Sequence, residues 1–281
     1  MSNIFVKPTS STRVLSEQHL SDIEQASLRA WPALEEQTLG GWRMRFSRGF
    51  TKRANSVSIP VTNGNPGSET ELLKKIEVCE QLYHDRSLPT IFRLVQVTEQ
   101  DKNISSIQTI DNVLANRNYR FCDASLVLAK ALTTTAFSPG TLNYVDLPTW
   151  LTGYQQISSA PAQVEHLHRL ILEGIQTQLL LALTRHKRES IACALGVLDG
   201  PLLGLFDIAT HPAYREQGFA RSLVQGLCAQ GADSGAKTVY LQVQEDNFAA
   251  IALYVALGFT PAYRYGYRIE DTKVRPTNIQ N

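Results

Sequence analysis

The stretch that decides the fold is DIATHPAYREQGFA, residues 207–220. It follows an apolar, β-favouring run at residues 202–208, so it is predicted to begin at the end of a strand. After it, apolar residues recur at helical spacing and predict a helix with one buried stripe: Ala220, Leu223, Val224, Leu227 and Cys228. The stretch is therefore interpreted as a strand end, a loop and the first turn of a helix.

The loop between this strand and this helix has the properties of an anion site. The first turn of a helix leaves backbone N–H groups without partners, and the helix dipole adds partial positive charge there. Gly218 has no side chain, so a ligand can approach its backbone closely. Together these properties predict a site for a phosphate or a pyrophosphate.

The same loop resembles the Arg/Gln-x-x-Gly-x-Gly/Ala signature with which GNAT acetyltransferases bind the pyrophosphate of coenzyme A. The matching residues are Arg215, Glu216, Gln217, Gly218, Phe219 and Ala220. The resemblance implies acetyl-CoA as the acetyl donor. It also implies that the backbone of the preceding strand end, at Ile208 and Thr210, binds the pantetheine arm.

Composition excludes several other classes of function. A formal net charge of +1 on 281 residues gives no electrostatic reason to expect nucleic acid or a membrane as partner. No apolar run approaches the roughly 20 residues of a membrane span, and the N-terminus lacks signal-peptide features, so we expect a cytoplasmic protein. The widely spaced cysteines are expected to be reduced core residues rather than disulfides or metal ligands: Cys79, Cys122, Cys193 and Cys228.

Hydrophobic periodicity predicts the same order of elements in both halves of the chain. In the first half we expect helices at 16–31, 69–85 and 106–117 and strands at 42–46, 55–61, 91–97 and 121–131. In the second half we expect helices at 147–154, 161–175 and 247–258, a further helix through 220–228, and strands at 178–184, 191–198, 202–209, 239–244 and 259–269. Asp199-Gly200 predicts a tight hairpin between two of these strands.

The repeated order predicts an α+β (mixed α/β) fold of two GNAT-like domains. Each would be a mixed, mostly antiparallel sheet flanked by helices. Residues 1–137 would form a degenerate N-terminal copy and residues 141–281 the catalytic domain, joined near Ser138-Pro139-Gly140. The alternative is that a mixed α/β chain has this order by chance.

Acyl transfer from a thioester to an amine requires a proton donor for the departing thiolate. Tyr254 is the candidate, because a phenol with a pKa near 10 stays protonated at neutral pH. Asn247 lies seven residues earlier, on the same helical stripe. The segments around both residues resemble the late GNAT motif, which implies that both face the cofactor. The alternative for Tyr254 is a core tyrosine with a satisfied hydroxyl.

The general base is a separate question. Asp207, at the end of a strand, is a carboxylate beside the expected thioester and could relay a proton from the amine through water. It could equally orient His211 or cap a turn, and the sequence leaves these alternatives open. Glu245 and Asp246 are the next candidates.

The first half lacks the corresponding chemistry. Aligning the helix ends places Leu114 opposite Tyr254 and Ile107 opposite Asn247, and the loop at 63–68 has no cofactor-loop spacing. We therefore expect this half to be a scaffold that shapes the substrate pocket. Arg53 and Asn55 are its candidate contacts to a substrate carboxylate or amide, with an ordinary structural role as the alternative.

No metal site is expected. His166 and His168 point about 200° apart on a helix, and no further ligand cluster joins them. The favoured hypothesis is an acetyl-CoA-dependent N-acetyltransferase in which a primary amine attacks the thioester directly. The alternative is a non-catalytic acyl-CoA-binding sensor or interaction module. The acceptor would be a small-molecule or peptide amine, whose identity the sequence does not reveal, and neither does it reveal the oligomeric state.

Overall fold

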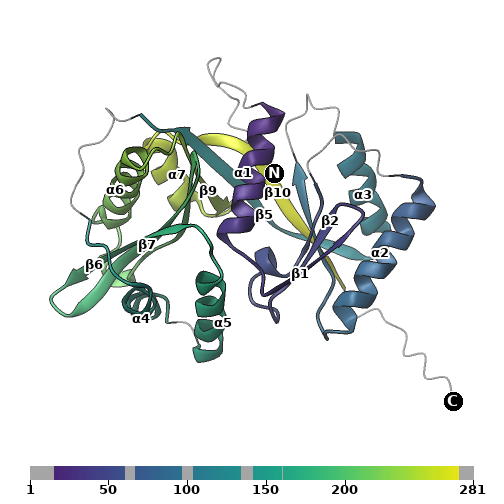
Figure 1. Ribbon diagram of the computed structural model, residues 1–281, viewed down its shortest axis with the longest axis horizontal. Coiled ribbons are helices and arrows are strands. Elements are labelled where there is room, and N and C mark those ends of the chain that lie inside the picture. The colour runs from purple at the N-terminus through teal and green to yellow at the C-terminus, as the bar shows by residue number, and fades with distance from the viewer. Residues whose placement is uncertain (1–15, 61–66, 97–103, 134–141, 160, 272–281) are drawn as a thin grey trace.

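The computed structural model describes residues 16–60, 67–96, 104–133, 142–159 and 161–271 (Figure 1). The helices are α1 (Glu17–Ala30), α2 (Glu69–His84), α3 (Ile104–Asn116), α4 (Leu147–Ser158), α5 (Ala162–Glu173), α6 (Phe219–Asp233) and α7 (Phe248–Ala256), with short 3-10 helices η1 (Lys52–Ala54) and η2 (Pro212–Tyr214). The strands are β1 (Glu35–Leu39), β2 (Trp42–Phe46), β3 (Val57–Ser58), β4 (Ile91–Gln96), β5 (Tyr119–Ala131), β6 (Gln178–His186), β7 (Glu189–Asp199), β8 (Leu202–Thr210), β9 (Thr238–Gln244) and β10 (Thr260–Glu270).

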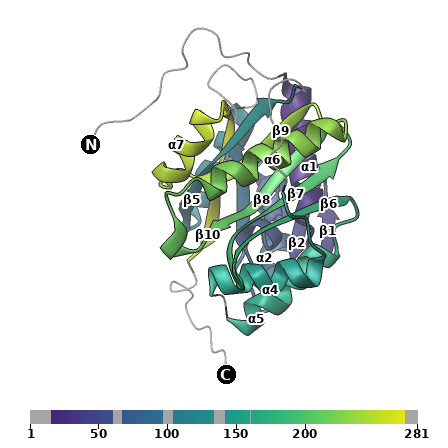
Figure 2. The same cartoon turned by 90° about the vertical axis from the view of Figure 1, so that its left-hand side faces the viewer.

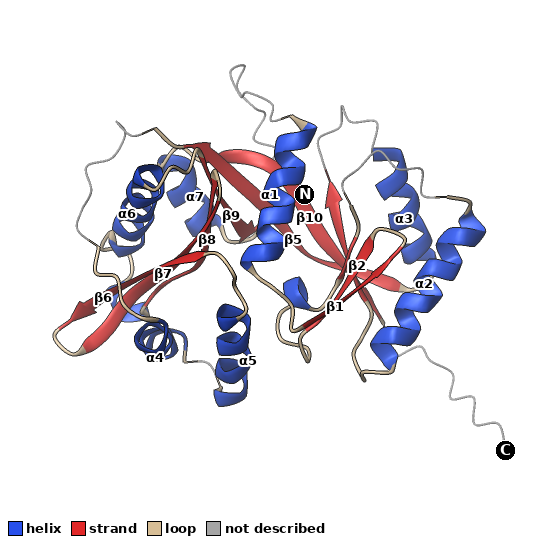
Figure 3. Ribbon diagram, in the orientation of Figure 1, coloured by secondary structure: helices blue, strands red, loops and turns tan. Residues whose placement is uncertain are grey.

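These strands form one mixed ten-stranded sheet in the order β1-β2-β3-β4-β10-β5-β9-β8-β7-β6. The pairs β3–β4 and β8–β9 are parallel, and the other pairs are antiparallel. Figure 3 shows the continuous sheet with helices around it. The predicted fold class, a mixed and mostly antiparallel sheet flanked by helices, is confirmed.

The two halves, α1 to β5 and α4 to β10, exchange their last strands. The sheet has the same order from either edge, and its centre is formed by β10 and β5. β10 pairs with β4 of the first half, and β5 pairs with β9 of the second half (Figure 1). The sequence did not predict this exchange. The predicted boundary between residues 137 and 141 lies outside the described residues and stays a prediction.

Polar contacts tie β10 to the first half. Arg93 of β4 and Glu24 of α1 form a buried ion pair, with Arg93 Nη2 3.1 Å from Glu24 Oε2. The Tyr263 hydroxyl of β10 donates to the same carboxylate oxygen at 2.7 Å. The Arg93 guanidinium also lies 3.9 Å from the centre of the Tyr265 ring. Since a buried charge is costly unless it is paired, this network favours one position for β10.

Helices cover both faces of the sheet (Figure 2). One apolar core lies under α1, α4 and α5 and includes Ile23, Trp150 and Ile171. On the opposite face, α6 and α7 cover the second half and α2 and α3 cover the first. Within the described chain, no helix combines the length and the apolar character that a membrane crossing needs.

Two elements differ from the prediction. β1 was not expected, because its exposed and polar residues 35–39 show no apolar alternation. Of the strand expected at 55–61, residues 55–60 are described, and they hold only the two-residue β3, preceded by η1. The reason is Asn55, whose side chain bonds to the loop before it and not to a neighbouring strand. All four cysteines are free thiols.

Candidate active site

A bulge in β8 places Asp207. The β7–β8 register passes from Leu195↔Phe206 to Cys193↔Ala209, so that two residues of β8 face one residue of β7. Phe206 packs under α1, α4 and α5, whereas Ile208 packs with the core under α6. Regular alternation would turn Asp207 towards α6. The extra residue, at φ +46°, instead places its carboxylate on the α4–α5 side of the sheet.

β8 and β9 separate just before this bulge. Their parallel pairing ends at Leu205↔Leu241, and residues 206–210 of β8 pair only with β7. A cleft of about 530 Å³ lies between the separated ends and passes through the sheet. The unpaired backbone edge of β8, which includes Ile208 and Thr210, can add an extended ligand as a further strand. This is the edge that the sequence assigned to the pantetheine arm.

The predicted cofactor loop leads into α6. Gly218, at φ +85°, is the N-cap of α6, and no side chain caps this helix. Ser222 donates to the Gly218 carbonyl at 3.0 Å, so the N–H groups of residues 219–221 precede the first helical hydrogen bond. A Cβ on Gly218 would have open space around it. The backbone at this helix start is therefore accessible to an anion, as a bound diphosphate requires.

The side chains of the loop leave this backbone uncovered. Arg215, Glu216 and Gln217 are exposed, and Glu216 adopts φ +62°. Arg215 Nε donates to the Thr210 carbonyl at 3.4 Å, which holds the arginine beside the strand end. Phe219 and Ala220, the first residues of α6, are half-buried. The loop therefore fits the pyrophosphate that the resemblance implies.

The corresponding helix start in the first half is closed by its own side chains. Ser68 Oγ accepts from the Glu71 backbone at 3.3 Å, and Glu71 Oε2 accepts from the Ser68 backbone at 2.8 Å. The Glu71 carboxylate thus occupies the N-terminal end of α2, where an anion would otherwise bind. Leu114 and Ile107, which align with Tyr254 and Asn247, are apolar. Leu114 is fully buried, and Ile107 packs on the same core.

Tyr254 and Asn247 line the cleft from α7. Tyr254 is buried against Phe259, and burial raises the pKa of its hydroxyl to about 12. At neutral pH the phenol is therefore protonated. Asn247 accepts a hydrogen bond from the Ala250 backbone at 3.2 Å and so caps α7 at the rim of the cleft.

His168 is the partner of Asp207, and it is the residue that the sequence interpretation missed. Its Nε2 lies 2.8 Å from Asp207 Oδ2, and its ring is buried among the rings of Tyr154, Trp31 and Phe50. Its spacing was an available signal, because His168 precedes Ile171 by three residues and Leu172 by four, which places it on the apolar side of α5. His211 does not pair with Asp207; its Nδ1 accepts from the Ala213 backbone at 3.3 Å.

A second, smaller cavity meets the cleft at Asp207 and Tyr154, which line both. Its volume is about 150 Å³, and α4 and α5 form one side of it. Trp31, Phe50 and Thr51 of the first half form the other side. The two halves of the chain thus build this cavity together.

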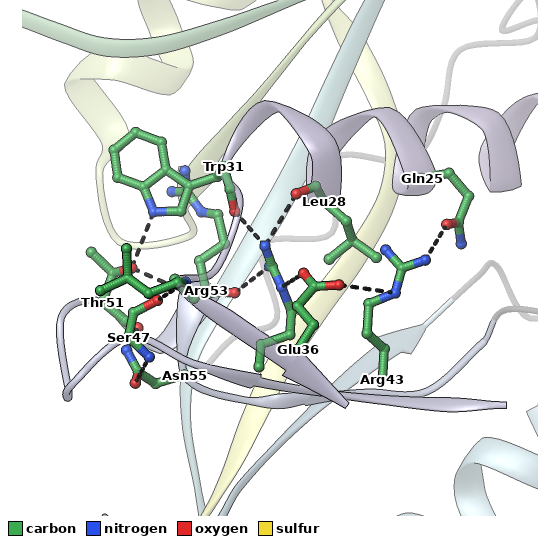
Figure 4. A network of polar contacts seen from close by, with 12 residues as sticks. Gln25, Leu28, Trp31, Glu36, Arg43, Ser47, Thr51, Arg53 and Asn55 are labelled. Carbon is green, nitrogen blue, oxygen red and sulfur yellow. Dashed lines mark hydrogen bonds and ion pairs between the residues drawn. The ribbon is translucent and has the colours of Figure 1, made fainter. Parts of the chain in front are cut away.

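Arg53 lines the cleft, and Figure 4 shows this residue beside Trp31. Its guanidinium stacks 5.2 Å from the Trp31 ring centre and 5.7 Å from that of Phe206. Its Nε is buried and has no hydrogen-bond partner among the described residues. The buried Arg45 donates to the carbonyls of Arg53, at 2.6 Å, and Leu28, at 3.1 Å, which fixes η1 against the end of α1.

Asn55 does not reach the cleft. Its amide oxygen accepts from the backbone of Ser47 and Gly49, and its amide nitrogen donates to the carbonyls of Phe50 and Thr51 (Figure 4). The side chain is buried and fully used in holding this loop. We therefore do not retain Asn55 as a substrate-binding residue.

Glu245 and Asp246 do not line either cavity, and Glu245 pairs with Arg264 at the surface. In the described part of the chain, no group of three or more His, Cys, Asp or Glu residues could hold a metal ion. Asp207, Tyr254 and Arg53 thus line one cleft, and His168 contacts Asp207 beside it.

A family model described as "Probable histone acetyltransferase Rv0428c C-terminal" matches residues 18–268. The chain belongs to this family. It is a GNAT-type acetyltransferase, and thus an acyltransferase enzyme, as its named homologues also indicate.

Individual relatives are similar to most of this chain or to a part of it. The uncharacterized N-acetyltransferase YobR of Bacillus subtilis (strain 168) is 27% identical over 260 residues, covering 88% of this chain and 97% of YobR. A GCN5-related N-acetyltransferase from Kribbella flavida has a TM-score of 0.66 at 15% identity, covering 92% of this chain and 96% of that one. The [ribosomal protein bS18]-alanine N-acetyltransferase of Escherichia coli (strain K12) is 45% identical over 76 residues, which are 27% of this chain and 50% of that protein.

Proposed function

We propose that this acetyltransferase moves the acetyl group of acetyl-CoA to a primary amine by direct attack of the amine on the thioester. One observation carries the proposal. The cleft between β8 and β9 passes through the sheet, with Tyr254 on the α7 side and Asp207 and its partner His168 on the α4–α5 side. A proton donor and a proton acceptor therefore lie on opposite sides of a single opening.

The cofactor loop and the edge of β8 supply the binding site for the donor. The N–H groups at the start of α6 would bind the diphosphate, and the backbone of residues 208–210 would bind the pantetheine amides. Acetyl-CoA supplies the acetyl group as a reactive thioester and departs as a thiolate. Gly218 keeps the approach to the backbone open.

Tyr254 acts as the general acid. Its Oη holds a proton at neutral pH because burial raises the pKa to about 12, and it would give that proton to the departing sulfur. None of the described residues hydrogen-bonds with this hydroxyl. It is therefore available to an incoming group.

Asp207 acts as the general base. Its carboxylate, directly or through one water, takes a proton from the substrate ammonium, which leaves a neutral amine to attack the thioester carbonyl. The C–N bond forms and the C–S bond breaks, and the second proton that the nitrogen loses restores the Tyr254 hydroxyl. His168 is a positioning residue: its Nε2–H donates to Asp207 Oδ2 and leaves the other carboxylate oxygen for the amine. Arg53, unpaired at Nε on the same cleft, is proposed to contact a polar group of the bound substrates.

An amine panel tests the proposal. The full chain is incubated with acetyl-CoA and each amine, while thiol release and the mass of the product are followed together. We expect one free coenzyme A for each N-acetylated amine. Tight acetyl-CoA binding without any acetylated product would overturn the proposal and favour the sensor alternative.

A further inference from the structure

The smaller cavity beside Asp207 has a mainly apolar surface, and the uncharged polar residues Thr51, Gln155 and Ser158 also line it. Trp31 at the end of α1, Phe50 in the following loop and Tyr154 of α4 contribute rings, and Leu151 and Val164 contribute aliphatic groups. Four ionisable side chains line the cavity: Tyr154, Glu165, His168 and Asp207. Among the residues that the structure describes, no lysine or arginine lines it. The walls therefore favour an apolar group attached to a cation over one attached to an anion.

The size of the cavity limits what it can hold. Its volume is about 150 Å³. An apolar cavity of about this volume accommodates one benzene molecule. One ring or one branched alkyl group therefore fits. A polyamine or a lysine side chain would place a second charged nitrogen in this small cavity, where the aromatic and aliphatic walls cannot solvate it.

The position of Asp207 gives the bound molecule an orientation. Asp207 is shared by this cavity and by the cleft through the sheet. An ammonium at its carboxylate would have its nitrogen at the cleft and its substituent in the cavity. The rings of Trp31 and Tyr154, which line the cavity, would then lie against that substituent.

We propose that the acceptor is a primary amine that carries one benzene-sized apolar group, and that this group occupies the cavity between the two halves. The proposal rests on the proposed function, since it names the acceptor of that reaction. It also assigns a role to the first half of the chain: Trp31 and Phe50 act there as specificity-determining walls.

Substrate preference is the first test. We would measure kcat/KM for 2-phenylethylamine, L-phenylalanine, spermidine and L-lysine with saturating acetyl-CoA. Burying one ring is expected to favour the better of the two aromatic amines by about tenfold or more over spermidine and lysine. Which aromatic amine is better shows whether a carboxylate is accepted next to the nitrogen. Preference for spermidine or lysine would overturn this inference and leave the N-acetyltransferase proposal intact, whereas no acetylation of any amine would overturn both.

A matched pair of variants is the second test. Val164 lines the cavity and is 36% exposed, and Val78 of α2 is a valine of similar exposure, 44%, away from both cavities. Val164→Trp fills the cavity from its rim. We expect kcat/KM for the preferred aromatic amine to fall about tenfold while KM for acetyl-CoA changes less than about twofold. Val78→Trp should leave both values unchanged.

A measurement of amine binding tests the proposal without depending on turnover. Isothermal calorimetry with 2-phenylethylamine and the unmodified protein, in the presence of coenzyme A, should show one site, and Val164→Trp should weaken it. Equal binding to both proteins, or an unchanged kcat/KM in Val164→Trp, would overturn the inference.

Discussion

The imidazole of His168 lies 2.8 Å from the carboxylate of Asp207 across 39 residues of sequence. Two local features bring them together. The bulge turns Asp207 out of the alternation of β8, and helical spacing turns His168 inwards from α5. Neither residue could be assigned this partner from its own neighbourhood, because the contact joins two elements that are far apart in the chain.

Replacement of His168 should lower turnover without affecting acetyl-CoA binding. His168→Phe keeps a ring in the aromatic surroundings but removes the hydrogen bond to Asp207, so we expect kcat to fall by about tenfold to a hundredfold with KM for acetyl-CoA unchanged. His168→Gln, which retains an N–H donor, should recover part of the loss. His166→Phe, an exposed histidine on the same helix, is the control.

The pair should also act as a unit. If His168 works through Asp207, the double variant His168→Phe/Asp207→Asn should be no slower than Asp207→Asn alone. Steady-state kinetics of the four proteins measure this coupling. Fully additive losses would contradict the positioning role.

Removal of the Tyr254 hydroxyl should reduce kcat by roughly a hundredfold, the low end of the range for general acid catalysis. Tyr254→Phe leaves the ring packed on Phe259, so stability should hold. Tyr83→Phe is the control, because that buried hydroxyl donates to the Arg45 carbonyl in the first half and serves the fold. If thiol release by Tyr254→Phe matched that of the unmodified protein, another group would be the acid.

The pKa of Tyr254 makes a prediction about pH. The acid form is required, and burial raises its pKa to about 12, so the hydroxyl keeps its proton well above neutrality. The kcat profile should therefore show no loss from this group between pH 7 and about 10, where an ordinary phenol would be half ionised. A fall centred near pH 10 that disappears in Tyr254→Phe would show an unshifted pKa.

Gly218→Ala separates backbone strain from ligand binding. Gly218 at φ +85° and Gly235 at φ +95° lie at opposite ends of α6, and a Cβ at either would meet open space. Both alanine variants should lose about 1 kcal/mol of unfolding free energy, since the left-handed region disfavours side chains. Only Gly218→Ala should raise KM for acetyl-CoA, by roughly tenfold. A similar rise in Gly235→Ala would mean that general loosening of α6 is responsible.

The sequence predicted those parts of the fold that depend on local signals. Asp199-Gly200 indicated the β7–β8 turn, and Asn247 indicated the start of α7; both are confirmed. Parts that depend on distant partners were missed. The exchange of β5 and β10 follows from contacts such as Tyr263 with Glu24, which are 239 residues apart.

The candidate site also has parts that local sequence predicted and parts that it did not. The cofactor loop and Tyr254 have sequence neighbours that resemble a known motif, and the structure places Tyr254, Asn247 and Ile208 on one cleft. Asn55 was proposed with Arg53 as a substrate contact, but its side chain is used by its own loop. His168 was considered only as a metal ligand, because its partner is created by a bulge that no sequence pattern indicated.

The buried ion pair at the strand exchange should be important for stability. Glu24→Gln leaves the Arg93 guanidinium buried without a counter-charge, so the free energy of unfolding should fall by about 3 kcal/mol in urea denaturation. Asp199→Asn breaks the Arg29–Asp199 pair, whose arginine is 53% exposed, and should cost less than about 1 kcal/mol. Equal losses from the two variants would contradict the structural importance of the buried pair.

The exchanged strands also constrain how the chain reaches its final state during synthesis. β4 pairs with β10, which ends at Glu270 and is synthesised after all the other described strands. β9 pairs with β5, which is synthesised before it. Until β10 has been made, β4 therefore lacks the neighbour that it has in the complete sheet. A fragment that ends at residue 137 would contain β4 without β10. Its β4 edge would be unpaired, and unpaired sheet edges promote association between molecules.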